Sequence, residues 1–198
     1  MFPEAHQMRH LDPWYFEGYK KVEILKPNGK KGSKLVYEGS WYAIPGGMNE
    51  LKKRKIQILF LSIVSVISFL LAQIFPSEGG MTTWVAVPSL IAILPIMYMI
   101  AGYFTFLPSR EKWEIRIYYG GYRRIYRSSV GVTVILAIWL GLEGTFIIMN
   151  RGLLFNELFY LFCIFISLGS AAAQTYIIYK NPAIEIKAKK AGEEPWWR

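Results

Sequence analysis

Residues 52–75 read KKRKIQILFLSIVSVISFLLAQIF, a run of four cations followed by an uncharged, apolar stretch. Crossing the hydrocarbon core of a bilayer, roughly 30 Å thick, takes about 20 helical residues. After the first such segment, at residues 56–75, others follow at residues 82–106, 130–149 and 153–179. Helices that are apolar all round are difficult to bury in a soluble domain of 198 residues. The sequence therefore predicts an all-α membrane protein, a four-transmembrane-helix antiparallel bundle.

The cations are distributed very unevenly around these segments. Of the 23 Lys and Arg residues, 22 lie before the first segment, between the second and third, or after the fourth, and Arg151 is the exception. Cytoplasmic flanks carry such an excess, which predicts a multi-pass protein of the cell membrane with both termini cytoplasmic. Anionic lipid accounts for the net charge of +9, so no nucleic-acid partner is expected. The residues expected to contact lipid headgroups are Lys52, Lys53, Arg54, Lys55, Arg123, Arg124 and Arg127.

The regions outside the spans are expected to form three cytoplasmic parts. In residues 1–55, two β-prone runs around a turn-rich stretch predict a β-hairpin within residues 21–44, with a further strand near its end. Residues 108–129 form a loop whose halves either extend the adjoining helices or lie along the membrane surface, and residues 180–198 form a tail. The connections on the other side are short, so we expect spans one and two, and spans three and four, to be antiparallel neighbours.

Polar residues recur on one face of the fourth segment at spacings of three and four. Helices in lipid associate through close packing of small residues and interhelical hydrogen bonds, so packing is the ordinary role of such a face. The alternative is a polar path through the bundle, which serines of the first segment could extend. The residues of this face and its match are Ser62, Ser65, Tyr160, Cys163, Ser167, Ser170 and Gln174.

Two acidic residues lie within the apolar segments, Glu143 in the third and Glu157 in the fourth. A charge at membrane depth is costly and by default indicates a functional site. The short connection between these segments would bring both acids near Arg151. We therefore treat Glu143, Glu157, Arg151 and Asn156 as a candidate ion, proton or substrate site. Alternatively, Glu157 is interfacial, and Glu143 is protonated or hydrogen-bonded to Asn156 or to the backbone.

Signatures of an enzyme are scarce in this sequence. His6 and His10, with Glu4 nearby, lack a convincingly spaced third metal ligand. Cys163 is the single cysteine, so neither a disulfide nor a thiolate metal site can form within one chain. We expect no catalytic residue, metal or cofactor.

Two functional hypotheses follow. The leading one is a non-enzymatic accessory, assembly or regulatory subunit that acts through its cytoplasmic face, with a membrane-protein partner or as a homo-oligomer. The alternative is a small transporter or channel component that uses Glu143 and the polar face of the fourth segment.

Overall fold

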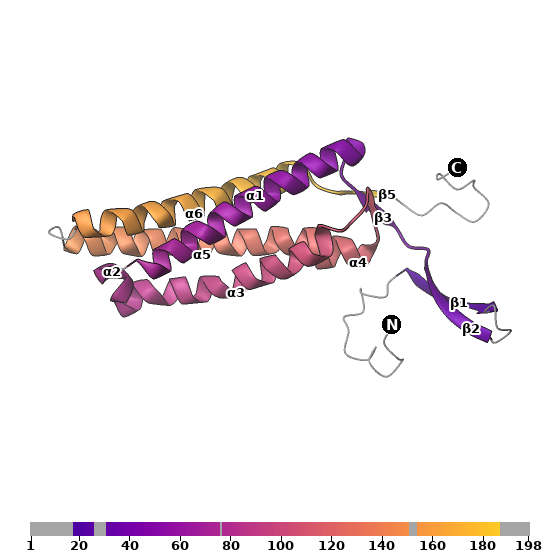
Figure 1. The fold of residues 1–198 in the computed structure, drawn as a ribbon, viewed down its shortest axis with the longest axis horizontal. Coiled ribbons are helices and arrows are strands. Elements are labelled where there is room, and N and C mark those ends of the chain that lie inside the picture. The colour runs from indigo at the N-terminus through magenta and orange to yellow at the C-terminus, as the bar shows by residue number, and fades with distance from the viewer. Residues whose placement is uncertain (1–17, 26–30, 76, 151–153, 187–198) are drawn as a thin grey trace.

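Four long helices lie side by side along the length of the molecule in this computed structural model, which describes residues 18–25, 31–75, 77–150 and 154–186 (Figure 1). The prediction of four helices long and apolar enough to cross a membrane is confirmed. They are α1 (Gly47–Ile74), α3 (Thr83–Phe106), α5 (Arg123–Met149) and α6 (Leu154–Lys180).

The helices α1 and α5 begin well before the apolar segments that predicted them. Lys and Arg are good helix formers, so the basic flanks continue the helical backbone beyond the apolar part. At the start of α1, Gly46 has a φ of 102°, a left-handed conformation that favours glycine. In α3 the helix continues through Pro88 and Pro95.

The closest helix pairs are α3 with α5, α1 with α6, and α5 with α6. The consecutive helices α1 and α3 meet through long side chains rather than through close backbones. Tyr103 of α3, for example, donates a hydrogen bond to the Ile58 carbonyl of α1 (3.2 Å). A one-turn helix, α2 (Glu78–Met81), lies between them where the sequence indicated only a short connection. We call the end of the bundle that contains α2 the distal end.

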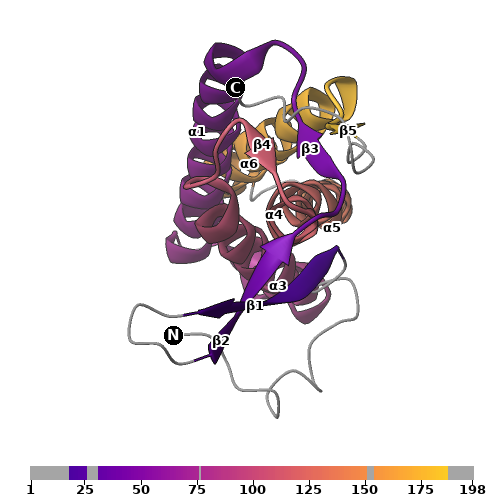
Figure 2. The same cartoon turned by 90° about the vertical axis from the view of Figure 1, so that its right-hand side faces the viewer.

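A small three-stranded sheet covers the opposite end, which we call the proximal end. Its central strand β3 (Trp41–Ala43) pairs antiparallel with β4 (Lys112–Trp113) and with β5 (Ile184–Ile186). Three distant parts of the chain therefore meet there (Figure 2). The ring of Trp113 is fully buried against Phe106, at 5.2 Å between ring centroids.

Most of the loop between the second and third spans is helical and continuous with α5. A single helical turn, α4 (Ile115–Ile117), passes into a π-helical turn, η3 (Tyr118–Tyr122), which continues directly into α5. Of the two arrangements expected for residues 108–129, the helical extension is therefore the one observed from residue 115 onward.

The predicted hairpin is present and consists of β1 (Tyr19–Leu25) and β2 (Lys31–Tyr37), paired antiparallel. It stands off the helix bundle at the proximal end (Figure 1). The strand expected after it exists as β3, but it pairs with β4 and β5 and not with the hairpin. Two tyrosines connect the hairpin to the segment before α5: the Tyr19 hydroxyl donates to the Glu114 carboxylate, and Tyr37 Oη accepts from Ile115 N (3.1 Å).

Candidate site at a buried pair of carboxylates

Glu143 of α5 and Glu157 of α6 are brought together at the distal end, and both are 0% exposed. Their carboxylates converge on Gly79 of α2. Gly79 N donates to Glu157 Oε1 (3.2 Å), and a Cβ placed on Gly79 would lie only 2.6 Å from Glu143 Oε2. Glycine at this position therefore lets α2 lie directly against both acids.

Glu157 is fully engaged in hydrogen bonds. Its Oε2 accepts from Ser77 Oγ (2.5 Å), and its Oε1 accepts from the backbone N–H groups of Glu78 (2.8 Å) and Gly79 (3.2 Å). Ser77 is the N-cap of α2 and in turn accepts from Gly80 N (2.8 Å). A carboxylate that accepts several hydrogen bonds is suited to carry a negative charge. Glu157 is thus held in place by hydrogen bonds from the start of α2.

Glu143 differs sharply from Glu157. Neither of its carboxyl oxygens accepts a hydrogen bond from a donor group among the described residues, although both are buried, and the contact with the Glu157 carboxyl becomes a hydrogen bond only when one acid is protonated. The group faces Glu157 and lies within electrostatic range of the Tyr160 hydroxyl. A buried, unpaired charge is expensive. The Glu143 carboxyl therefore has to hold a proton or a cation in this environment.

Trp139 lies one helical turn before Glu143 on the same face of α5. Its indole Nε1 is also buried without a hydrogen-bond partner among the described residues. The ring packs edge-on against Phe69 and Tyr160, with centroids 5.8 Å and 5.6 Å away. These aromatic rings form the apolar floor beneath the carboxylate pair.

The other two members of the predicted site fall outside what the structure describes. Arg151 is one of the residues without a described position, and Asn156 belongs to α6 but its side chain is not described. Sequence reasoning also missed the contribution of α2. Ser77 does carry a signal for it, because serine is one of the preferred N-cap residues of helices.

The predicted polar face of α6 meets α1 in the middle of the bundle. Ser62 Oγ donates to Gln174 Oε1 (2.5 Å) and also bonds the Tyr103 hydroxyl. Nearer the distal end, Ser65 Oγ donates to the Ser167 carbonyl (3.0 Å), and Ser167 Oγ donates to the Ser65 carbonyl (2.9 Å). These four polar side chains are buried and paired, an arrangement that holds α1 against α6.

The remaining residues of the predicted face are divided. Tyr160 lies at the carboxylate pair: a Cβ on Gly80 would be 2.8 Å from its hydroxyl. Cys163 is buried in the core cluster with Phe69 and Trp139, whereas Ser170 is half-buried. The apolar layer around Phe69 and Trp139 thus separates the carboxylates from the serine and glutamine cluster.

The cations predicted to contact lipid headgroups differ in exposure and in partners. Lys52, Lys53 and Arg127 are exposed, and Arg123 and Arg124 are half-buried. Lys55 instead donates to the carbonyls of Leu107 (2.9 Å) and Ser109 (2.6 Å), at the C-terminal end of α3.

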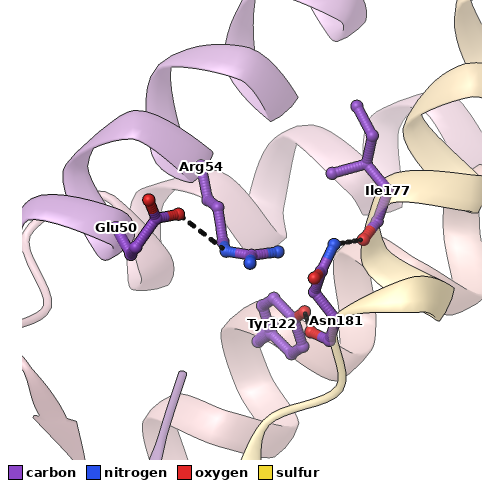
Figure 3. Close-up of polar contacts among 5 residues, drawn as sticks. All are labelled: Glu50, Arg54, Tyr122, Ile177 and Asn181. Atoms are coloured by element: carbon purple, nitrogen blue, oxygen red, sulfur yellow. Dashed lines mark hydrogen bonds and ion pairs between the residues drawn. The ribbon is translucent and has the colours of Figure 1, made fainter. Parts of the chain in front are cut away.

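The Arg54 side chain is only 16% exposed and points toward Tyr122 and Asn181 (Figure 3). Its closest acidic partner is Glu50, at 3.8 Å. Behind it, the Tyr122 hydroxyl donates to the Asn181 carbonyl (2.7 Å), which connects η3 to the segment after α6.

Comparison of the chain with protein-family models, curated proteins and solved structures found no match. Among the described residues, no group of three or more His, Cys, Asp or Glu side chains could hold a metal ion.

Proposed function

We propose that this chain is a small transporter or channel component of the cell membrane that takes up a proton or a small cation at Glu143. The observation that carries the proposal is the Glu143 carboxyl, which is fully buried in a helix of membrane-spanning length and has no hydrogen-bond partner among the described residues. The proposal includes an antiparallel four-helix bundle with both termini in the cytoplasm and the distal end at the outer surface.

The contrast between the two acids supports this proposal. Glu157 is committed to Ser77 Oγ and to two backbone N–H groups, so its negative charge has a fixed position. Glu143 faces that group and has no donor partner of its own among the described residues, so a hydrogen bond between the two acids requires a proton on one of them. Two carboxyl groups in such different surroundings take different roles. Glu157 is the permanent anion, and Glu143 is the group that exchanges its proton or cation.

The test is the response of the purified protein to protons and cations. We expect the melting temperature of the wild type to change with pH, or on addition of Li⁺, Na⁺, K⁺ or Ca²⁺, and the isosteric Glu143→Gln variant to lose that response. Glu78→Gln is the matched control, because the Glu78 side chain is exposed at the same end and only its backbone N–H contacts the site. A Glu143→Gln protein that responds like the wild type would overturn the proposal.

Transport itself is measured in vesicles that contain the purified protein and a pH-sensitive or cation-sensitive dye. The wild type and Glu78→Gln are expected to move the ion identified by the melting experiment, and Glu143→Gln is not. Equal fluxes through all three proteins would remove Glu143 from any transport role.

A second candidate function, an accessory or regulatory subunit, is favoured by the hairpin. Its two strands stand off the bundle, and Val22 and Val36 are exposed on it. The proposed partner is another membrane protein that contacts this surface. Photo-crosslinking from Val22 or Val36 in native membranes should then recover one dominant protein that crosslinking from Leu94, exposed on α3, does not recover. The same products from all three positions would count against this candidate.

A further inference from the structure

A cleft at the proximal end lies between the start of α5 and the end of α6, well away from the carboxylate pair. Its volume is about 550 Å³. Tyr118, Tyr122 and Tyr126 line one side, and two cations, Arg123 and Lys180, line it from different helices. No acidic side chain is among the described residues that line it. The two cations, without an acid beside them in this lining, therefore suit an anion.

The walls of the cleft are held in place by contacts outside it. The Tyr122 hydroxyl donates to the Asn181 carbonyl (2.7 Å), which joins the two sides of the cleft (Figure 3). Tyr118 stacks on Tyr42 of β3 with ring centroids 4.2 Å apart. The guanidinium of Arg123 lies over the Tyr119 ring, 4.7 Å from its centroid. The cleft is thus largely pre-formed, which lowers the entropic cost of binding.

The π-helical turn η3 supplies part of this wall. Such turns are rare and occur frequently at functional sites. Here the turn carries both Tyr118 and Tyr122, and it packs closely on α3 because position 121 is glycine: a Cβ there would lie 3.1 Å from Phe106 Cβ and 3.2 Å from Phe106 N. The wide turn therefore positions the two tyrosines at the cleft.

The floor of the cleft indicates where the anion comes from. Ile178, Pro182 and Ala183 give it an apolar base, and the neighbouring Tyr179 is 71% exposed on the outer face of α6. Tyrosines are enriched where a helix leaves the hydrocarbon layer, at the level of the lipid headgroups. An anion that brings an acyl chain can use both the apolar base and the adjoining helix face, whereas free phosphate can use neither.

We propose that this cleft binds the phosphate of an anionic phospholipid, with Arg123 and Lys180 as its cationic ligands and Tyr118 and Tyr126 beside them. Basic pockets between transmembrane helices bind acidic lipid headgroups in this manner. Arg123 offers a planar guanidinium that can bind two phosphate oxygens. This site is independent of the function proposed for Glu143.

The experiment measures lipid binding to the full chain, purified in a non-ionic detergent, by native mass spectrometry. The probes are phosphatidylglycerol, phosphatidylcholine and inorganic phosphate. The wild type should prefer phosphatidylglycerol. With each cation near the surface worth about 1 kcal/mol, the double variant Arg123→Gln/Lys180→Gln should bind it about thirtyfold more weakly. The double variant Lys20→Gln/Lys21→Gln removes the same charge from exposed positions of the hairpin at the same end, and should bind almost as well as the wild type.

Three results would overturn the proposal. They are equal binding of the two lipids, equal loss in both double variants, and binding of inorganic phosphate as tight as that of phosphatidylglycerol. If Arg123→Gln/Lys180→Gln does not fold, Lys180→Gln alone decides the question, because Lys180 is exposed and its removal leaves the packing intact. A loss of about fivefold is then expected, and an unchanged affinity contradicts the site.

Discussion

At each end of the bundle, an ionisable side chain pairs with backbone groups at a helix terminus: an acid at the distal end and a lysine at the proximal end. At the distal end, the N-terminus of α2 offers its backbone N–H groups to Glu157. At the proximal end, the C-terminal end of α3 and the residues after it offer carbonyls to Lys55. Both pairings follow the polarity of a helix, whose start favours anions and whose end favours cations. The difference is that Glu143 remains without a partner among the described residues.

An unpaired buried charge is most informative where its side chain is too short to reach another partner. Several cations at the proximal end lie against rings or carbonyls that their long side chains can reach, although the Nε atoms of Arg54 and Arg124 are buried without a hydrogen-bond partner among the described residues. Arg124, for example, lies over the Tyr98 ring at 4.5 Å from its centroid. Glu143 has a short side chain and no such freedom. Glu143 is therefore the residue on which the proposed function rests, and the side chains of Lys55 and Arg124 connect their helices to α3.

The largest expected effect tests whether Glu157 closes the distal end. Glu157→Ala removes three hydrogen bonds and leaves the Ser77 hydroxyl and two N–H groups without their acceptor. We expect a loss of about 3 kcal/mol in the free energy of unfolding, measured by denaturation in mixed micelles. Glu78→Ala, at an exposed position, should change it by less than about 0.5 kcal/mol. Similar losses in both variants would show that α2 is not held by Glu157.

The next effect concerns the close approach of η3 and α3 at the proximal end. In Gly121→Ala the new Cβ would lie 3.1–3.3 Å from Phe106 atoms, including backbone N and Cα, so one element has to move. A cost of about 1–3 kcal/mol is expected in the same assay. Gly120→Ala is the control, since its Cβ would meet only Thr105 Cγ2, at 3.8 Å. A Gly121→Ala protein as stable as this control would mean that the two elements are not tightly packed.

A smaller effect is expected midway between the two ends. The reciprocal bonds between Ser65 and Ser167 connect α1 to α6. A double-mutant cycle with Ser65→Ala and Ser167→Ala should give a coupling of about 0.6 kcal/mol, the average for hydrogen bonds within membranes. Ser65→Ala with Ser170→Ala, at a half-buried position, should show no coupling. Equal couplings in both cycles would contradict a specific contact.

The smallest effect is a pH dependence of the proximal sheet. Burial, followed by the nearby Glu185 carboxylate, raises the pKa of Tyr42 to about 12. The unfolded chain loses this proton near pH 10. Stability from this group is therefore complete below about pH 10 and decreases as the pH rises toward about 12. Tyr42→Phe keeps the ring on Tyr118 and should show a shallower decrease in melting temperature over that window.

A second tyrosine should behave in the same direction. Burial, followed by the hydrogen bond to Glu114, raises the pKa of Tyr19 above its ordinary value. Tyr19→Phe therefore should also lessen the alkaline loss of stability. If neither phenylalanine variant alters the decrease, the alkaline transition does not originate at the proximal end.

Sequence patterns could predict what depends on neighbours along the chain. The apolar segments predicted the spans, and the turn-rich stretch predicted the hairpin, because both signals are local. The three-stranded sheet could not be predicted in the same way. Its strands β4 and β5 comprise two and three residues, and they pair only because α3 and α6 end beside β3.

The candidate site was predictable only in part for a similar reason. Span positions and a short connection place Glu143 near Glu157. The position of α2 decides how the two acids differ. Glu157 accepts hydrogen bonds there, whereas Glu143 has no donor partner among the described residues. The position of α2 follows from a contact at Gly79 that no periodicity reveals.

The order of the three sheet strands along the chain has a consequence for biosynthesis. Its central strand β3 precedes α1, β4 follows the second span, and β5 follows the fourth. A growing chain therefore exposes β3 early and can complete its pairing only after α6 has been made. The finished sheet can form only in a chain whose four helices are all in place, so a chain that stops before Ile184 should insert with β3 still open on one edge.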